Sequence, residues 1–459
     1  MNASSDNPLW TPSESAAEQS SMRRFMDFVT ERFAVDENDY DALWDFSIED
    51  REVFWDTLRK FSGLTASHWG DRVCSNRAKM PGAKWYPDAR LNYAENMLMR
   101  RDDGEAMVFR GEDQVETRLS WAELYNQVSV LAQALRSEGI IAGDRVSGYM
   151  PNMGETIIAM LASASIGATW SSCSPDFGVQ GVLDRFGQIE PKLLISVDGY
   201  FYNGKTHSMT EKLRDVMDGL PPCNRVLIVP YTSQSPDISD IPGAVLLADF
   251  TRDYRPTEIE FAQLPFDHPL YIMYSSGTTG VPKCIVHGAG GTLIQHAKEQ
   301  LLHCDIQPDD RVFYFTTCGW MMWNWLASAL GRGATLLLYD GSPFYPDGNV
   351  LWDYAQAEKM TFFGTSAKYI DAMAKAGLKP IETHRLDALR AMASTGSPLA
   401  PESFDYVYQA IKGDIHLASI AGGTDIISCF MLGNPAAPVW RGEIQCRGLG
   451  MAVDVFDDD

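Results

Sequence analysis

The sequence predicts an α/β protein with two lobes built on largely parallel sheets. Short apolar segments alternate with segments of helical period through most of the chain, and this alternation is typical of βαβ units. A chain of 459 residues also exceeds one ordinary core, since domains usually hold about 100–200 residues. One apolar segment is followed directly by a loop rich in glycine and hydroxyl groups, and open α/β sheets bind ligands at the carboxyl ends of their strands.

The first hundred residues change character after about twenty positions. Residues 1–20 are rich in Ser, Asn, Asp and Pro, and we expect them to be flexible, with Trp10 as an anchor. Apolar residues then recur at helical spacing between positions 22 and 61, which predicts two or three amphipathic helices. Ser47 is the expected N-cap of the last of these helices. We therefore assign residues 1–105 to a flexible N-terminus and a helical extension.

The alternating part of the chain covers residues 106–430. A strand at 107–109 precedes a strongly periodic helix at 121–137, for which Ser120 is the predicted N-cap. Further strands are predicted at residues 144–150, 192–197, 225–230, 270–274, 311–315, 334–339 and 362–364, with a helix at 155–166. Residues 231–242 are rich in Pro and Ser, and we expect the chain to pass from the first lobe to the second near this loop.

Composition excludes several classes of function. Asp and Glu number 61 and Lys and Arg 38, which gives a net charge of −23, so the surface repels nucleic acid and acidic membranes. No stretch reaches the roughly 18 apolar residues of a membrane span, and the first residues do not resemble a signal peptide. The eight cysteines are scattered without a C-x-x-C pair. We expect a reduced cytoplasmic protein and, without a coiled-coil pattern, a monomer.

The loop at 274–283 reads YSSGTTGVPK and follows the apolar run at 270–273. Its hydroxyl groups and its flexible glycines are those of Ser275, Ser276, Thr278 and Thr279, and of Gly277 and Gly280. Backbone N–H groups beside glycine can approach an anion, and Lys283 adds a positive charge, so the loop indicates a phosphate site. It is not the P-loop of NTPases, because two residues separate Gly280 from the lysine. Composition alone favours an ordinary surface loop.

A family resemblance decides between these interpretations. The ten residues resemble the phosphate-binding signature of the adenylate-forming superfamily, which includes acyl-CoA synthetases, luciferases and the adenylation domains of peptide synthetases. The longer run from 271 to 347, with IVHGAGG, TTCGWMMWNW and YDGSPFYPD, is similar more narrowly to the branch that activates acetoacetate. The resemblance implies the large domain of such an enzyme, which uses ATP and Mg²⁺ to form an acyl-AMP and then transfers the acyl group to coenzyme A.

The resemblance also implies roles for single residues. Lys283 would contact the β- and γ-phosphates, Thr424 the α-phosphate, and Asp425 the Mg²⁺ ion, although many relatives have Glu at that place. Gly423, which precedes Thr424, is assigned with them to the nucleotide site, and its alternative interpretation is a backbone hinge beside Gly422. The adenine would lie against the backbone of Gly396, Ser397 and Pro398. Read without the resemblance, each of these stretches is an ordinary turn or loop.

The acid would lie against a second group of residues. By resemblance its pocket wall consists of Trp320, Met321, Met322 and Trp323, and Gly422 replaces a tryptophan that floors the smaller pocket of acetyl-CoA synthetases. An aromatic and methionine cluster is core by default, and we hold the two interpretations level. Gly422 could instead serve a turn. His287 lies near the acid by resemblance, and a packed histidine fits it almost as well.

Residues 431–459 alternate and turn at glycines, which predicts the start of a small β-barrel that is cut short. Relatives add a small C-terminal domain with a catalytic lysine, whereas the last lysine here is Lys412. We expect that domain to be absent and turnover by this chain alone to be impaired. Two alternatives stay open, namely a synthetase for another short acid and a nucleotide- or acyl-adenylate-binding domain without turnover.

Overall fold

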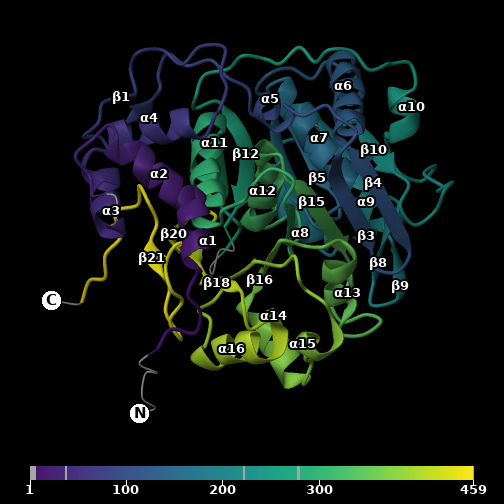
Figure 1. Cartoon of the computed structure of the whole chain (residues 1–459). Helices are drawn as coiled ribbons and strands as arrows, with labels where there is room; N and C mark the ends of the chain where they lie inside the picture. The colour runs from purple at the N-terminus through teal and green to yellow at the C-terminus, as the bar shows by residue number, and fades with distance from the viewer. Residues whose placement is uncertain (1–6, 37–38, 221–222, 276–279, 458–459) are drawn as a thin grey trace.

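Two seven-stranded sheets form the body of the protein (Figure 1). The computed structural model describes residues 7–36, 39–220, 223–275 and 280–457. The first sheet runs β11 (Ala244–Leu246), β10 (Val226–Val229), β7 (Leu193–Val197), β5 (Arg145–Tyr149), β6 (Thr169–Cys173), β12 (Pro269–Tyr274) and β13 (Cys284–Gly288). Its strands pair in parallel except for β13, which runs antiparallel to β12. Strands buried on both faces, such as β5 to β7, are typical of a parallel sheet covered by helices.

The second sheet is also mostly parallel, and its strands come from two separate parts of the chain. It runs β18 (His416–Ser419), β17 (Ala391–Thr395), β16 (Phe362–Ser366), β14 (Arg311–Tyr314), β15 (Thr335–Asp340), β3 (Glu105–Gly111) and β4 (Val115–Ser120). Only β4 pairs antiparallel, in a hairpin with β3. An α/β fold with parallel-rich sheets, as predicted, is therefore confirmed.

The predicted place of the change between lobes is wrong. The loop at 231–242 joins β10 to β11, which are neighbours in the first sheet, and β12 and β13 still belong to that sheet. The chain enters the second sheet for the last time at β14, after having contributed β3 and β4 to it earlier. Proline and serine mark a turn of the backbone, and a turn can join two strands of one sheet as readily as two lobes.

Helices cover the sheets on both sides. Those around the first sheet are α6 (Trp121–Ser137), α7 (Gly154–Ser165), α8 (Val179–Ile189), α9 (Thr210–Asp218) and α10 (Leu247–Thr251). Those that follow are α11 (Ala289–Lys298), the π-helix η1 (Glu299–His303), α12 (Met321–Ala327), the 3₁₀-helix η2 (Ser328–Arg332), α13 (Val350–Ala357), α14 (Ala367–Lys375), α15 (Pro380–Thr383), α16 (Pro401–Tyr406) and the π-helix η3 (Val407–Ile411). Ser120 caps α6 in a complete capping box with Glu123, as its sequence predicts.

The N-terminal extension is more ordered than expected. It holds α1 (Glu14–Gln19), α2 (Ser21–Thr30), α3 (Tyr40–Glu49), α4 (Arg51–Phe61) and α5 (Tyr93–Met97), with the short strand pair β1 (Cys74–Ser75) and β2 (Lys84–Trp85). A second short pair, β8 (Gly199–Tyr202) and β9 (Lys205–Ser208), lies outside the extension, after β7. The prediction of flexibility does not hold for positions 14–19, which form α1, whereas the expected anchor Trp10 does donate through Nε1 to Asp414 Oδ1 at 3.0 Å. Ser47 is also not an N-cap. It lies within α3, fully buried, and its hydroxyl donates to the Trp44 carbonyl.

The two ends of the described chain pack against each other. A third sheet consists of β19 (Ala421–Gly423), β20 (Ser428–Leu432) and β21 (Cys446–Arg447), all antiparallel. Figure 1 shows β20 and β21 beside α2 and α3. Tyr40 donates to the Arg447 carbonyl at 2.6 Å, and Trp44 Nε1 to the Met451 carbonyl at 3.1 Å. The β-barrel stays a prediction, of which the described residues supply three strands.

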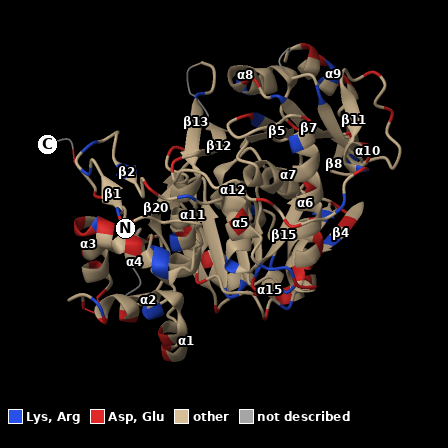
Figure 2. Ribbon diagram, turned by 90° about the horizontal axis from the view of Figure 1, so that it is seen from above, with Lys and Arg blue, Asp and Glu red and all other residues tan. Residues whose placement is uncertain are grey.

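Charged residues lie mainly around the periphery of the ribbon, as Figure 2 shows. The interior is apolar, with one large hydrophobic cluster and a second one around the carboxyl half of the second sheet. None of the helices in the described ranges is long and apolar enough to cross a membrane.

Candidate active site

Three chain segments meet beside the two large sheets. They are the hairpin of β12 and β13, the carboxyl end of β17, and the turn between β19 and β20. His287 on β13 donates through Nε2 to the carbonyl of Thr424 in that turn, at 2.7 Å. Thr395, the last residue of β17, donates through its hydroxyl to the Ile420 carbonyl just before β19, at 3.2 Å. The segments assigned to phosphate, adenine and metal are therefore neighbours.

The predicted phosphate loop is the tip of the β12–β13 hairpin. Positions 276–279, which include Ser276, Gly277, Thr278 and Thr279, lie outside the described residues, so the structure places only the flanks of the loop. Ser275 N–H donates to the Lys283 carbonyl at 3.1 Å, and Lys283 N–H donates to the Ser275 hydroxyl at 3.2 Å. These two bonds close the neck of the loop.

The flanks have the backbone and the charge that the sequence predicts for a phosphate loop. Gly280 has φ of +113°, and no atom lies within 4 Å of the place where a Cβ would stand. This left-handed conformation favours glycine. Lys283 is exposed, so its ammonium group is available to an anionic ligand at the mouth of the loop.

The turn at 424–427 presents Thr424 and Asp425. Thr424 is half-buried and Asp425 exposed. The Thr424 carbonyl accepts from His287 and also, at 3.3 Å, from the N–H of Ile427. Burial lowers the pKa of His287 below its usual value of 6.5, so the imidazole is neutral near pH 7 and donates as a single N–H group.

The carboxyl end of β17 lies next to this turn. Gly396 has φ of +88°, a conformation that favours glycine, and Ser397 and Pro398 follow it. All three residues are exposed. An exposed backbone at the carboxyl end of a parallel strand is where open α/β sheets bind ligands. Adenine binding here stays a prediction.

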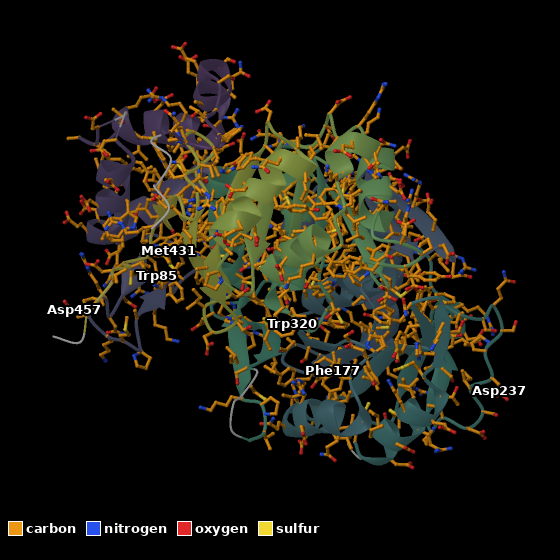
Figure 3. The ribbon with its side chains drawn as sticks, turned by 90° about the horizontal axis from the view of Figure 1, so that it is seen from below. Trp85, Phe177, Asp237, Trp320, Met431 and Asp457 are labelled. Carbon is orange, nitrogen blue, oxygen red and sulfur yellow. The ribbon has the colours of Figure 1, made fainter. Side chains whose placement is uncertain are left out.

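The predicted acid pocket divides into two kinds of residue. Trp323 is fully buried, and its Nε1 donates to Asn152 Oδ1 at 3.0 Å, so it belongs to the core. Met321 and Met322 are buried as well. Trp320, in contrast, is 60% exposed and projects from the start of α12 on the same side of the molecule as Phe177 (Figure 3). Of the four residues, only Trp320 presents most of its side chain outside the core.

The structure has no free space beside Gly422 of the kind that the absence of an indole side chain predicts. A Cβ on Gly422 would lie 2.1 Å from the Ser428 carbonyl oxygen and 2.6 Å from the Cys429 Cα, because β20 passes directly against it. The backbone role of Gly422, which the sequence left as an alternative, is therefore favoured over an enlarged pocket. A Cβ on neighbouring Gly423 would have no atom within 4 Å.

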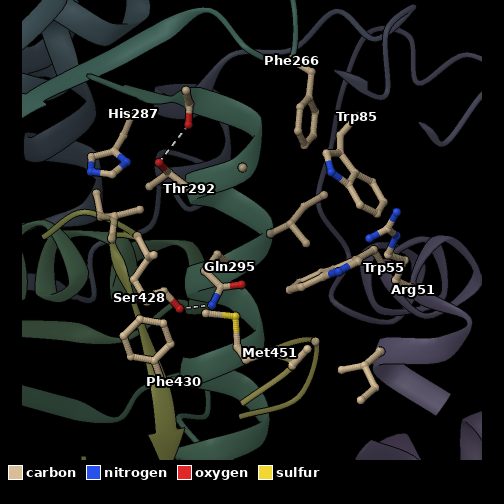
Figure 4. A pocket seen from close by; sticks show the side chains of 18 of the residues that line it. Arg51, Trp55, Trp85, Phe266, His287, Thr292, Gln295, Ser428, Phe430 and Met451 are labelled. Atoms are coloured by element: carbon tan, nitrogen blue, oxygen red, sulfur yellow. Dashed lines mark hydrogen bonds between the residues drawn. The ribbon is translucent and has the colours of Figure 1, made fainter. Parts of the chain in front are cut away.

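A cavity of about 590 Å³ is lined in part by His287 (Figure 4). Its wall combines the N-terminal extension, α11, β20 and the last described residues. Side chains around it include Arg51, Trp55, Trp85, Phe266, His287, Gln295, Phe430 and Met451. Sequence reasoning missed this cavity, because Trp55 and Trp85 lie in the segment that we assigned to a helical extension without a functional role. Aromatic residues at helical spacing gave no signal beyond packing.

No group of three or more His, Cys, Asp and Glu residues suited to a metal ion occurs in the part of the chain that the structure describes. Mg²⁺ does not need such a group, since it is usually held by one or two carboxylates together with substrate phosphates and water. Asp425 offers an exposed carboxylate next to Thr424, whose carbonyl is bonded to His287 on the strand that leaves the phosphate loop, so the donor set fits a nucleotide-bound Mg²⁺.

Comparison with known proteins gives consistent matches. The family described as "AMP-binding enzyme" matches residues 95–458, and that described as "Acetyl-coenzyme A synthetase N-terminus" matches residues 40–97. The chain is 56% identical to acetoacetyl-coenzyme A synthetase of Rhizobium meliloti (strain 1021), over 99% of this chain and 70% of that protein. It is 48% identical to acetoacetyl-CoA synthetase of Danio rerio, over 97% of this chain and 67% of that protein.

A solved structure agrees with these sequence matches. Acetoacetyl-CoA synthetase from Streptomyces lividans superposes with a TM-score of 0.92 and 41% identity, over 98% of this chain and 70% of that one. The chain thus spans about 70% of the length of each relative. The expected absence of a small C-terminal domain stays a prediction, since these shares state only how much of each relative is matched.

Proposed function

Because this chain belongs to the AMP-binding enzymes and, within them, to the acetoacetyl-CoA synthetases, it is an AMP-forming acid–CoA ligase, and we propose that it converts acetoacetate, ATP and CoA into acetoacetyl-CoA, AMP and pyrophosphate. The observation that carries the assignment of its site is the hydrogen bond from His287 to the Thr424 carbonyl. It brings the strand that leaves the phosphate loop against the turn that presents Thr424 and Asp425.

In the first step a carboxylate oxygen of acetoacetate attacks the α-phosphorus of ATP, and the bond from that phosphorus to pyrophosphate breaks. The residues at the site divide this task. Lys283 and the loop amides hold the β- and γ-phosphates, and Thr424 faces the α-phosphate, where negative charge is redistributed as the reaction proceeds. The Asp425 carboxylate would hold Mg²⁺, which supplies positive charge to the phosphate oxygens.

In the second step the thiol sulfur of CoA attacks the acyl carbon, the bond to AMP breaks, and the thiol proton is released to solvent. Trp320, Met321 and Met322 lie at the start of α12 and are the residues that we assign to the side of the acid. Sequence and geometry assign no residue to CoA. We further propose that the protein acts in the cytoplasm as a monomer, in keeping with its acidic surface and its scattered cysteines.

Exchange of labelled pyrophosphate into ATP tests the first step alone, because it needs only formation of the acyl-AMP. We expect exchange that depends on acetoacetate and Mg²⁺ and is slower with acetate or butyrate. Asp425→Asn, which keeps the side-chain size and removes its charge, should raise the Mg²⁺ concentration at half-maximal rate. An unchanged Mg²⁺ requirement in this variant would contradict the metal role.

The same assay separates the alternatives. Faster exchange with another acid would identify a synthetase for that acid. Binding of ATP·Mg²⁺ in calorimetry without exchange for any acid would identify a nucleotide-binding domain without turnover. Formation of acetoacetyl-CoA, measured beside the exchange, tests the expectation that turnover by this chain alone is impaired.

A further inference from the structure

The turn that presents Thr424 and Asp425 ends in a strained residue. Ile427 has φ of +47°, and a positive φ is a genuine outlier for a β-branched side chain. Such a conformation persists only where the surroundings over-determine it, and it is concentrated at functional sites. Two buried side chains on the neighbouring helical segment hold Ile427 and the residues after it in place.

His296 on α11 holds Ile427 directly. Its Nε2 donates to the Ile427 carbonyl at 3.0 Å, and its Nδ1 lies 2.7 Å from the Ser328 hydroxyl. Because a carbonyl only accepts, Nε2 carries the ring hydrogen, and Nδ1 accepts from Ser328. The Tyr93 hydroxyl, 2.7 Å from Ser328 Oγ, completes the chain. His296 is 1% exposed, so this contact excludes water.

Glu299 holds the two residues that follow. Its Oε1 accepts from the Ser428 hydroxyl at 2.6 Å and from the Cys429 N–H at 2.8 Å. Its Oε2 accepts from Trp325 Nε1 at 3.1 Å. Glu299 is fully buried and is the first residue of the π-helix η1, a form that is frequent at functional sites. A buried carboxylate with several charge-assisted bonds fixes its partners firmly.

His296 and Glu299 are three residues apart and so lie on one face of the same helical segment. Together they hold Ile427, the last residue of the turn, and Ser428 and Cys429, which follow it. Neither side chain is exposed, so neither can reach a nucleotide in solution. Their effect on the site must pass through the backbone of the turn.

We propose that His296 and Glu299 are positioning residues, which fix the strained turn so that Thr424 and Asp425 face the nucleotide. The ligand in this inference, ATP·Mg²⁺, rests on the proposed function, whereas the contacts of His296 and Glu299 with the turn do not depend on it. Loss of either side chain releases the turn, weakens the binding of ATP·Mg²⁺ and slows formation of the acyl-AMP. The fold around the two sheets stays intact, because these contacts involve only the few residues that end and follow the turn.

The chain offers a matched control in His303. It lies on η1, is fully buried, and donates through Nδ1 to the Gly433 carbonyl at 2.8 Å, beyond the far end of β20. His303 therefore resembles His296 in its burial and in donating to a backbone carbonyl, and it lies on the π-helix that directly follows α11. The residue that it holds, however, is far from the turn. Replacement of either histidine should destabilise the protein, and only His296 should affect the site.

The experiment compares His296→Leu with His303→Leu by amide hydrogen exchange of residues 424–429 and by calorimetric titration with ATP·Mg²⁺. We expect both variants to lower Tm. Only His296→Leu should speed exchange in the turn and raise the Kd for ATP·Mg²⁺, each by about tenfold, as for one lost buried hydrogen bond. Ser328→Ala, which removes the donor to Nδ1, should act in the same direction if His296→Leu does not fold.

Equal exchange rates of the turn and equal affinities in the two histidine variants would overturn the proposal. Hydrogen exchange also keeps the two claims apart. If the unaltered chain bound no ATP·Mg²⁺, the proposed function would fail, and the exchange of residues 424–429 would still decide whether His296 fixes the turn. Glu299→Gln, which keeps the side-chain volume and removes the charge, should speed exchange at Ser428 and Cys429 most.

Discussion

Lys283 is the positive charge at the neck of the candidate phosphate loop, and it is exposed. Lys283→Ala removes one charge-assisted contact to a phosphate, which is worth about 1.5–3 kcal/mol. We expect the Kd for ATP·Mg²⁺ to rise by roughly tenfold to a hundredfold, measured by calorimetry. Lys205→Ala, an exposed lysine on β9, is the matched control and should leave the Kd unchanged. Equal affinity in the Lys283 variant would remove this residue from the site.

Gly422 and Gly423 are adjacent glycines that the structure distinguishes. A Cβ on Gly422 meets the backbone of β20 at 2.1 Å, whereas a Cβ on Gly423 has no atom within 4 Å. We expect Gly422→Ala to lower the free energy of unfolding by about 1–3 kcal/mol, the usual cost of overpacking, and Gly423→Ala to change it little. Denaturant unfolding measures both. If Gly422→Ala were as stable as Gly423→Ala, the space beside Gly422 would be open and the larger acid pocket would again be favoured.

At the scale of the element, hydrophobic period predicted α2, α3, α4, α6 and α7, and apolar runs predicted most of the buried strands, whereas the later helices were not predicted. The helix α6 was predicted with its boundaries and its cap, β7 and β10 were found as apolar runs, and β5 lies within the mixed segment 144–150 that was predicted as a strand. These signals work because a buried face must be apolar and a helix end must satisfy its N–H groups.

The strand β6 shows why other elements escaped. Its sequence is TWSSC, which looks polar, and yet all five residues are buried. The Ser171 hydroxyl donates to the Ile272 carbonyl at 2.8 Å, and the Ser172 hydroxyl to the Cys318 carbonyl at 2.6 Å. A serine satisfied by backbone can be buried at little cost. The partners come from distant parts of the chain, so no local pattern reveals them.

In the candidate site, too, short local patterns were found from the sequence and contacts between distant residues were missed. Resemblance indicated the loop, the turn and the end of β17, because each depends on a short local pattern. The His296 and Glu299 contacts were not predicted, since they join residues about 130 positions apart through buried bonds. The acid pocket stays a prediction. Burial separates Trp323 from Trp320, and sequence alone cannot show which face of a short helix is covered.

At the scale of the whole molecule, two buried histidines hold the segment from 433 to 449 against the body. His303 donates to the Gly433 carbonyl and accepts from the Leu449 N–H at 3.3 Å. His416 on β18 bonds through Nε2 to Gln445 Oε1 at 2.7 Å. This segment in turn contacts α3 through the Tyr40 bond to Arg447. The two histidines therefore stabilise the contact between the two ends of the described chain.

Protonation of these histidines should weaken that contact in acid. Burial lowers the pKa of His303 from 6.5 to about 3 and that of His416 from 6.5 to about 4. Between these values and pH 6.5 the unfolded chain binds protons that the folded chain does not. Stability is therefore full above pH 6.5 and falls as the pH falls, by about 1.4 kcal/mol per pH unit for each histidine. Asp340 opposes this trend, because burial raises its pKa to about 7.

A difference measurement isolates one histidine from the opposing groups. His303→Gln removes one titrating group, so the variant should be less stable than the unaltered chain at pH 7, and the gap should shrink by about 1.4 kcal/mol for each pH unit from 6.5 toward 4. Urea unfolding followed by circular dichroism at several pH values gives the gap. A gap for His303→Gln that stayed constant between pH 6.5 and 4 would show that His303 takes up protons equally in the folded and the unfolded chain, and that acid acts on the two ends of the chain through other groups.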